Sequence, residues 1–116
     1  MKQQLSEQHK AAVNRRRRVV VNFDAHHAEP HFTEVDPEQL AKLSFTFADD
    51  EGSQIDSIWW NWSEGHEGPY PSKVLQLFDH PRYKKWVEDG VDIMKIFLEE
   101  TQKRGLEVFH SYRING

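Results

Sequence analysis

Two carboxylates in this sequence follow short runs of β-forming residues. Asp24 ends the run "RVVVNFD", and Glu64 comes two residues after the run "IDSIWWNW". Two carboxyl groups on neighbouring strand ends can act together as a general acid and a general base. We therefore predict Asp24 and Glu64 as catalytic candidates. The alternative for Glu64 is a solvated carboxylate, or one that accepts a hydrogen bond from a ligand hydroxyl.

Aromatic and hydrogen-bonding side chains gather at the same predicted strand ends. Indole and phenol rings stack on apolar C–H faces, and amide, guanidinium and imidazole groups hydrogen-bond to hydroxyls. We expect Trp62 to be exposed because it stands where the second strand ends, whereas Trp59 or Trp60 can point into the core. The predicted binding residues are Asn61, Trp62, Tyr70, His110, Tyr112, Arg113 and Asn115.

Histidines next to Asp24 allow a second interpretation. His26 and His27 follow the first predicted strand, and with Asp24 they could hold a divalent metal ion, as in a metallohydrolase. Their spacing is irregular, and the sequence contains no cysteine. Our leading interpretation therefore includes no metal and no other cofactor.

The elements that position these residues alternate between strand and helix. The pattern predicts strands at 18–24, 55–62 and 106–112 and helices at 36–52 and 81–104. The first strand is rich in valine and is expected to be buried on both faces. The expected helix-start residues are Asp36 and Pro37 for the first helix and Asp79 and Pro81 for the second, and Lys103, Arg104 and Gly105 are expected to end the second.

Alternating strands and helices predict an α/β fold of the order β-α-β-α-β. Parallel neighbours need a long crossover, which a helix supplies with right-handed geometry. Doubly wound sheets and eight-stranded barrels both begin in this way. The stretch "FDAHHAEPH" after the first strand is not the glycine-rich turn of a nucleotide-binding sheet, which favours a barrel. In either fold, ligands bind at the carboxyl ends of the strands.

Three stretches also carry a resemblance to a known family. "VVVNFD", "IDSIWWNWSEG" with "PYPSKV", and "KRGLEVFHSYRING" resemble the first third of the glycosyl hydrolase-like (β/α)8 barrels, over roughly residues 16–116. The more specific parts are the Tyr70-Pro71-Ser72 turn and the junction from Arg104 to Glu107. The resemblance implies carbohydrate as the ligand class.

The chain is shorter than the barrel enzymes that it resembles. Barrel enzymes of this kind have about 250 residues, whereas this chain has 116. We expect an N-terminal fragment of a glycoside hydrolase-like protein, with a polar helix or disordered arm at 1–15 and a partial barrel domain at 16–116. We also expect that the chain alone hydrolyses no glycoside. A non-catalytic carbohydrate-binding or assembly module is the third interpretation.

Charge and hydropathy argue against several partners. Residues 1–18 carry a net charge of +5 and residues 19–116 a net charge of −9, so the body does not suit a phosphate backbone. We interpret the arginine run 15–18 as a solvated helix end rather than a nucleic-acid site. The chain lacks the roughly 20-residue apolar run that spans a bilayer, and its start is too polar for a secretory signal. We predict a cytoplasmic location as written, although a parent protein could be exported, and self-association through an uncovered sheet.

Overall fold

The computed structural model describes residues 4–25 and 36–113. In this part of the chain, the helices are α1 (Glu7–Asn14), α2 (Pro37–Ser44), α3 (Thr46–Asp49), α4 (Pro81–Glu88) and α5 (Ile93–Lys103). The strands are β1 (Val20–Asp24), β2 (Ser57–Glu64), β3 (Glu67–Gly68), β4 (Gln76–Leu77) and β5 (Glu107–Arg113). The fold is mixed α/β.

The sheet is mostly parallel, and β2 is its central strand. β1 and β5 both pair with β2 in parallel, with Asn22 opposite Trp59 and Trp59 opposite Phe109. Beyond the end of β2, β3 pairs with it antiparallel and β4 pairs with β3 in parallel. These two short strands lie between the strand predicted at 55–62 and the helix predicted at 81–104, where the sequence predicted neither strand nor helix.

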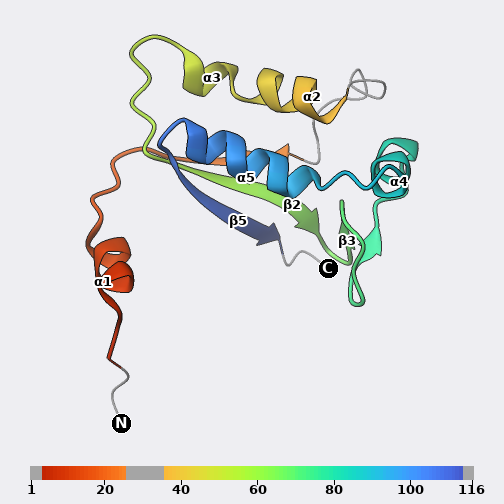
Figure 1. The fold of residues 1–116 in the computed structure, drawn as a ribbon, viewed down its shortest axis with the longest axis horizontal. Helices are drawn as coiled ribbons and strands as arrows, with labels where there is room; N and C mark the ends of the chain where they lie inside the picture. The colour runs from red at the N-terminus through yellow and green to blue at the C-terminus, as the bar shows by residue number, and fades with distance from the viewer. Residues whose placement is uncertain (1–3, 26–35, 114–116) are drawn as a thin grey trace.

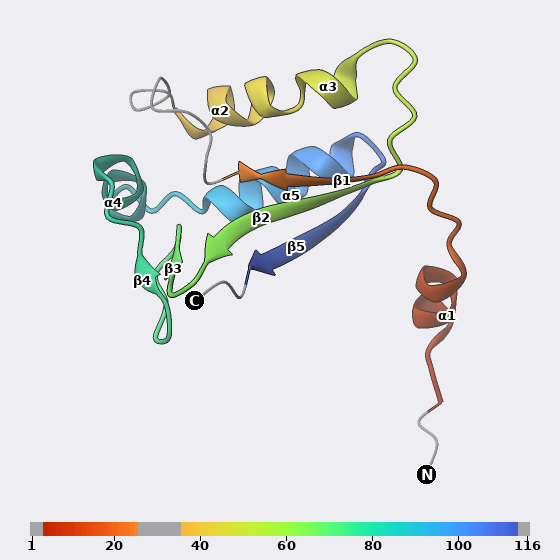
Figure 2. The ribbon, with the colours of Figure 1, turned by 180° about the vertical axis from the view of Figure 1, so that it is seen from behind.

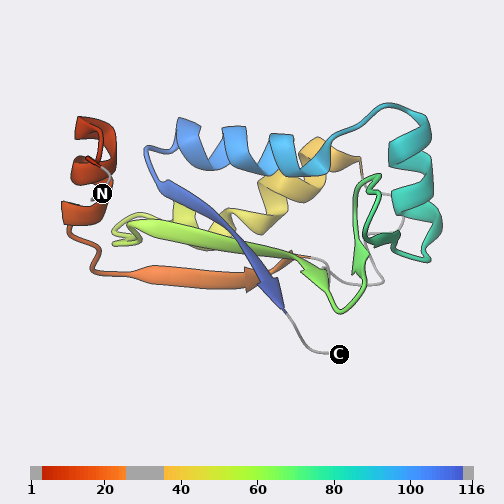
Figure 3. The same ribbon diagram turned by 90° about the horizontal axis from the view of Figure 1, so that it is seen from below.

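The helices α2, α3 and α5 lie on one face of the parallel strands, and no described helix covers the other face, which we call the open face (Figures 1 and 3). The core lies between these layers. The ring of Phe97 on α5 contacts Trp60 and Trp62 of β2 edge to face, with centroid distances of 4.8 and 4.9 Å. Trp60 Nε1 donates to Thr101 Oγ1 at 2.9 Å. A hydrogen-bonded indole fixes α5 over the centre of the sheet.

The open face corrects the prediction for the first strand. β1 is an edge strand of exposed and half-buried residues, so it is not buried on both faces. Phe23 stacks on Phe47 under the helices, whereas Asn22 and Val20 point to the uncovered side and are exposed. Valine enrichment does not distinguish a strand covered twice from one covered once.

The helix predicted at 81–104 is two helices. α4 ends at Glu88, Gly90 takes a φ of +72°, and α5 begins at Ile93 with Asp92 as its N-cap. His80 rather than Asp79 caps α4 and accepts from the amide of Arg82. α4 lies with β3 and β4 beyond the carboxyl ends of the strands (Figure 1).

Other predicted helix ends are confirmed. Asp36 Oδ1 accepts from the amides of Glu38 and Gln39, and Pro37 is the first residue of α2. Gly105, with a φ of +68°, follows the last turn of α5. The helix predicted at 36–52 breaks at Phe45 into α2 and α3.

The N-terminal helix α1 stands clear of the body and has no buried residue (Figures 1 and 2). The segment after it is tied to the amino end of the sheet. Asp56 Oδ2 accepts from the amides of Arg18 and Val19 at 2.8 and 3.0 Å. Arg17 forms a two-point ion pair with Glu107. Part of the arginine run therefore has an internal, structural role.

Candidate functional site at the carboxyl ends of the parallel strands

Three polar side chains meet where the parallel strands end. Asn61 Nδ2 donates to Asp24 Oδ1 at 3.1 Å, and Arg113 Nη2 donates to Asp24 Oδ2 at 2.6 Å. Asp24 lies on β1, Asn61 on β2 and Arg113 on β5. The sequence predicted all three, and the structure brings them together. We call Asp24, Asn61 and Arg113 the polar cluster.

Strand register explains why the polar cluster forms. Asp24 is the register partner of Asn61, and Asn61 is the partner of Ser111. A register shift after Asn61 places Arg113 opposite Glu64 at the end of the ladder. Asn61 is completely buried between the outer strands, whereas Asp24 and Arg113 keep part of their side chains in solvent. A ligand can therefore reach the charged members of the cluster.

An aromatic pair lies one layer below the polar cluster on the same open face. Trp59 and Phe109 have a ring-centroid distance of 5.2 Å, and each is 39% exposed. Side chains alternate between faces, so the rows of Trp59 and Asn61 lie about 7 Å apart along the strand. One ligand can contact both rows. The sequence reasoning missed this pair, although strict two-residue alternation from Asn61 would have found Trp59.

The expectation that Trp62 is exposed is wrong. Its side chain is 1% exposed, because it points to the helix-covered face and packs against Phe97. The strand continues to Glu64, two residues beyond its predicted end. Trp62 therefore belongs to the core, and the ring free to stack on a ligand is that of Trp59.

His110 and Tyr70 lie apart from the polar cluster. His110 is the register partner of Trp60, so it faces the helix side, where partial burial lowers its pKa because the charged imidazolium is disfavoured. Tyr70 lines a hollow of about 480 Å³ beside the joint between α4 and α5. The sequence placed both residues on one rim, but the structure gives them separate surroundings.

Tyr112 has a structural contact at the same strand end. Its hydroxyl donates to the carbonyl of Gly65, and the Gly65 amide donates to the carbonyl of Arg113 at 3.2 Å. These bonds tie the end of β5 to the turn after β2. Tyr112 therefore holds the backbone that carries Arg113, and its ring stays 39% exposed.

The remaining predicted residues differ in how far the structure describes them. Glu64 is half-buried at the end of β2, opposite Glu67 of β3. His26, His27 and Asn115 lie outside the described residues. Among residues 4–25 and 36–113, no group of three or more histidine and acidic side chains is arranged to hold a metal ion.

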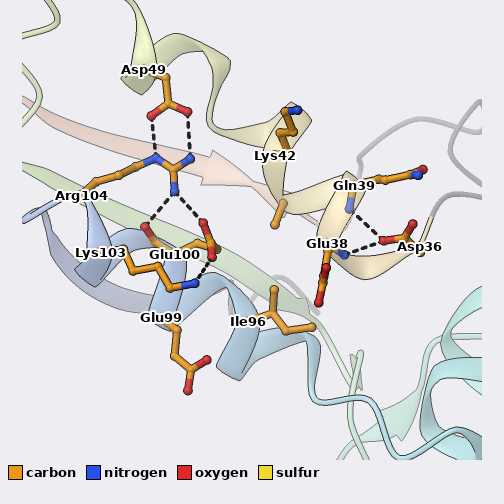
Figure 4. A pocket seen from close by; sticks show the side chains of 11 residues that line it. Asp36, Glu38, Gln39, Lys42, Asp49, Ile96, Glu99, Glu100, Lys103 and Arg104 are labelled. Carbon is orange, nitrogen blue, oxygen red and sulfur yellow. Dashed lines mark hydrogen bonds and ion pairs between the residues drawn. The ribbon is translucent and has the colours of Figure 1, made fainter.

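A hollow of about 720 Å³ between α2 and α5 is not a candidate site (Figure 4). Four of its charged side chains, those of Asp49, Glu100, Lys103 and Arg104, bind one another. Arg104 contacts both carboxylate oxygens of Asp49 at 2.6 and 2.8 Å and lowers the pKa of Asp49 by hydrogen bonding. Glu100 accepts from Lys103 and Arg104. This network fastens α3 to α5 on the side of the molecule away from the open face.

Comparison with known proteins finds no matching family model, curated relative or solved structure. The chemistry of the site must therefore be argued from its geometry. A buried amide that orients a carboxylate, a guanidinium on the same carboxylate and an exposed indole beside them can bind a polar ligand with one apolar face.

Proposed function

We propose that the chain binds carbohydrate at the polar cluster, as the opening part of a glycoside hydrolase-like (β/α)8 barrel. The observation that carries this proposal is the meeting of Asp24, Asn61 and Arg113 at the carboxyl ends of three parallel strands. Ligand sites of (β/α) barrels form at that end. The sequential strand order β1-β2-β5, with the described crossover helices on one face, is compatible with a barrel start.

Sugar chemistry fits the two rows of the open face. Asp24 accepts hydrogen bonds from hydroxyls, and Arg113 donates to them, so together they can bind adjacent hydroxyls of one ring. The exposed Trp59 ring offers an apolar surface for the C–H face of the sugar. Since Asn61 holds Asp24 in place, little side-chain entropy remains to be lost when a ligand binds.

Hydrolysis by this chain alone is not part of the proposal. Glycosidases need two carboxyl groups on either side of the scissile bond, and Asp24 is held in an ion pair with Arg113. Glu64 remains the candidate general acid, with Asp24 as its candidate partner. Assay of the chain with aryl glycosides should give background rates. Turnover that is abolished in Glu64→Gln would make Glu64 catalytic.

The binding test compares two arginine substitutions, one in the polar cluster and one outside it. The chain is titrated calorimetrically with a panel of soluble oligosaccharides, and Arg113→Gln should weaken binding by about tenfold or more, the scale of a lost charged hydrogen bond. Arg16→Gln, an exposed change in the N-terminal segment, is the matched control and should leave binding unchanged. Absence of binding by the unmodified chain, or equal effects of both changes, would refute the proposal.

A metallohydrolase centred on Asp24 is the second candidate, and one observation weighs against it. Asp24 Oδ1 accepts from Asn61 and Oδ2 from Arg113, so a metal ion would have to displace at least one of these donors. Its other predicted ligands, His26 and His27, lie outside the described residues. Stoichiometric zinc or manganese binding that raises Tm would favour this candidate.

The open face of the sheet also suggests a partner for the chain, namely a second copy of itself. We propose that it supports self-association, because parallel sheets are almost always covered on both faces.

In the described part of the chain, no helix has the length and apolar character needed to cross a membrane. A cytoplasmic location stays a prediction, as does the expectation that nucleic acid is not a partner.

A further inference from the structure

A groove of about 580 Å³ opens between α5 and the edge strand β5, on the helix-covered side of the sheet. Its floor is the edge of the core, formed by Trp62, Phe97 and Val108. Leu98 lines it and is 41% exposed. The buried Trp62 Nε1 has no hydrogen-bond acceptor among the described residues. The apolar side chains that solvent reaches along this flank of α5 are Leu98 and the half-buried Met94 and Val108.

The shape of this groove suits a helix. On its other flank α5 packs beside α2, so the helix layer is continuous there (Figures 1 and 3). The groove continues the same layer past α5 and over β5, where none of the described helices lies. Helices in such layers pack 8 to 10 Å apart through apolar side chains, about the width of one helix. An amphipathic helix would complete the layer.

The chain also contains a helix that lacks a packing surface. Within α1, His9, Ala12 and Val13 share one face by three- and four-residue spacing, and Val13 is 70% exposed. Eight-residue helices are marginal in water unless they pack on something. The bonds of Arg17 and Asp56 fix the following segment at the amino end of the sheet and direct α1 away from the body (Figure 2).

We propose that α1 of one copy docks in the α5–β5 groove of a second copy. Ala12 and Val13 of α1 cover Leu98 and the half-buried apolar side chains of the groove, and the arginines that follow α1 approach the acidic side chains at its rim. The groove is lined by Asp92 and Glu99 against Lys95, and the exposed Arg16 and Arg18 follow α1, so the charges at the two surfaces are complementary. This inference concerns a different surface from the polar cluster and does not depend on carbohydrate binding.

Sedimentation velocity of the intact chain over a wide concentration range tests the proposal. Val13→Asp in α1 and Leu98→Lys in the groove should each raise the dissociation constant about tenfold or more, since each removes an apolar contact. Both positions are exposed within one copy, so the fold should persist by circular dichroism. Val74→Asp is the matched control, because Val74 is 88% exposed and lies outside both surfaces.

Mixing two variants sharpens the test. Combining V13D chains with L98K chains should recover association, because an acid on one α1 then meets a base in the other groove. Association unchanged by V13D, or a monomer at every concentration, would overturn the proposal. A monomer in which the α1 amides are protected from exchange would show that α1 docks on its own groove, which also contradicts docking between copies.

Discussion

At the scale of single residues, three neighbouring tryptophans have different environments because strand side chains alternate. Trp60 and Trp62 point under α5, whereas Trp59 points to the open face. The indole nitrogen of Trp59 donates to Ser57 Oγ at 3.2 Å, which orients its ring along that face. Position in the pleat, rather than residue type, therefore decides which ring is available to a ligand.

Trp62→Ala should destabilise the fold by about 3 to 5 kcal/mol, the usual cost of emptying a large buried aromatic site. Trp59→Ala, the matched change on the open face, should cost much less stability and should weaken sugar binding instead. Urea denaturation followed by circular dichroism measures the first effect, and oligosaccharide titration the second. Equal stability losses in the two variants would mean that the open face is covered in solution.

At the scale of elements, Asp56 joins the N-terminal segment to the start of β2. Hydrogen bonds from the amides of Val19 and Arg18 lower the pKa of Asp56, because they favour its charged form. Its contribution to stability is therefore complete above the unfolded-state pKa of about 3.9 and is lost as pH falls through the lower folded value. The attachment of the segment that follows α1 should be acid-labile.

This predicts that the amide signals of Arg18 and Val19 stay fixed near neutral pH and shift only below pH about 4. NMR spectra recorded during an acid titration follow both amides directly. Asp56→Asn should abolish the acid-dependent step, whereas Asp50→Asn, an exposed change elsewhere, should preserve it. A midpoint above the ordinary aspartate range would contradict the assigned hydrogen bonds.

At the scale of the whole molecule, the described helices cover one side of the parallel sheet only. Val20, Trp59 and Phe109 are partly exposed on the other side, and among the described strands β1 and β5 each pair only with β2. Apolar faces and open edges of this kind promote association between chains. Two surfaces, this open face and the α5–β5 groove, therefore compete as explanations of any oligomer.

Val20→Asp should suppress association that uses the open face. Val20 is 44% exposed on that face and does not line the α5–β5 groove, so the added charge makes burial of the open face alone unfavourable. Light scattering of this variant beside L98K separates the two surfaces, because Leu98 lies on α5 on the opposite side of the sheet. If L98K alone abolishes association, the open face is not the interface.

Much of the element order could be predicted from local sequence patterns. The three long strands and the α2 start follow from β-branched runs and from Asp36-Pro37, because these signals act within a few residues. The break at Gly90 was missed because apolar spacing continued across it, although a glycine inside a helical pattern is a known stop. The strands β3 and β4 have two residues each and are too short to show the apolar–polar alternation of a strand.

The residues of the candidate site could be predicted from the sequence, but the directions of several side chains could not. Asp24, Asn61 and Arg113 stand at strand ends, and parallel pairing alone brings such ends together. The direction of Trp62 and His110 depends on which face of the sheet the helices cover, and the placement of Arg113 depends on the register shift after Asn61. These are tertiary features, and a one-residue error in strand register reverses every side chain.

The attachment of the N-terminal segment also sets an order of events during synthesis. Asp56 lies 38 positions after Arg18, whereas Glu107 lies 90 positions after Arg17. A chain is synthesised from its N-terminus, so Asp56 is available to the N-terminal segment before Glu107 is. The segment can therefore bind to β2 before β5 has been synthesised. When β5 arrives, Glu107 meets an arginine already in position, and the last parallel strand is guided into register from its amino end.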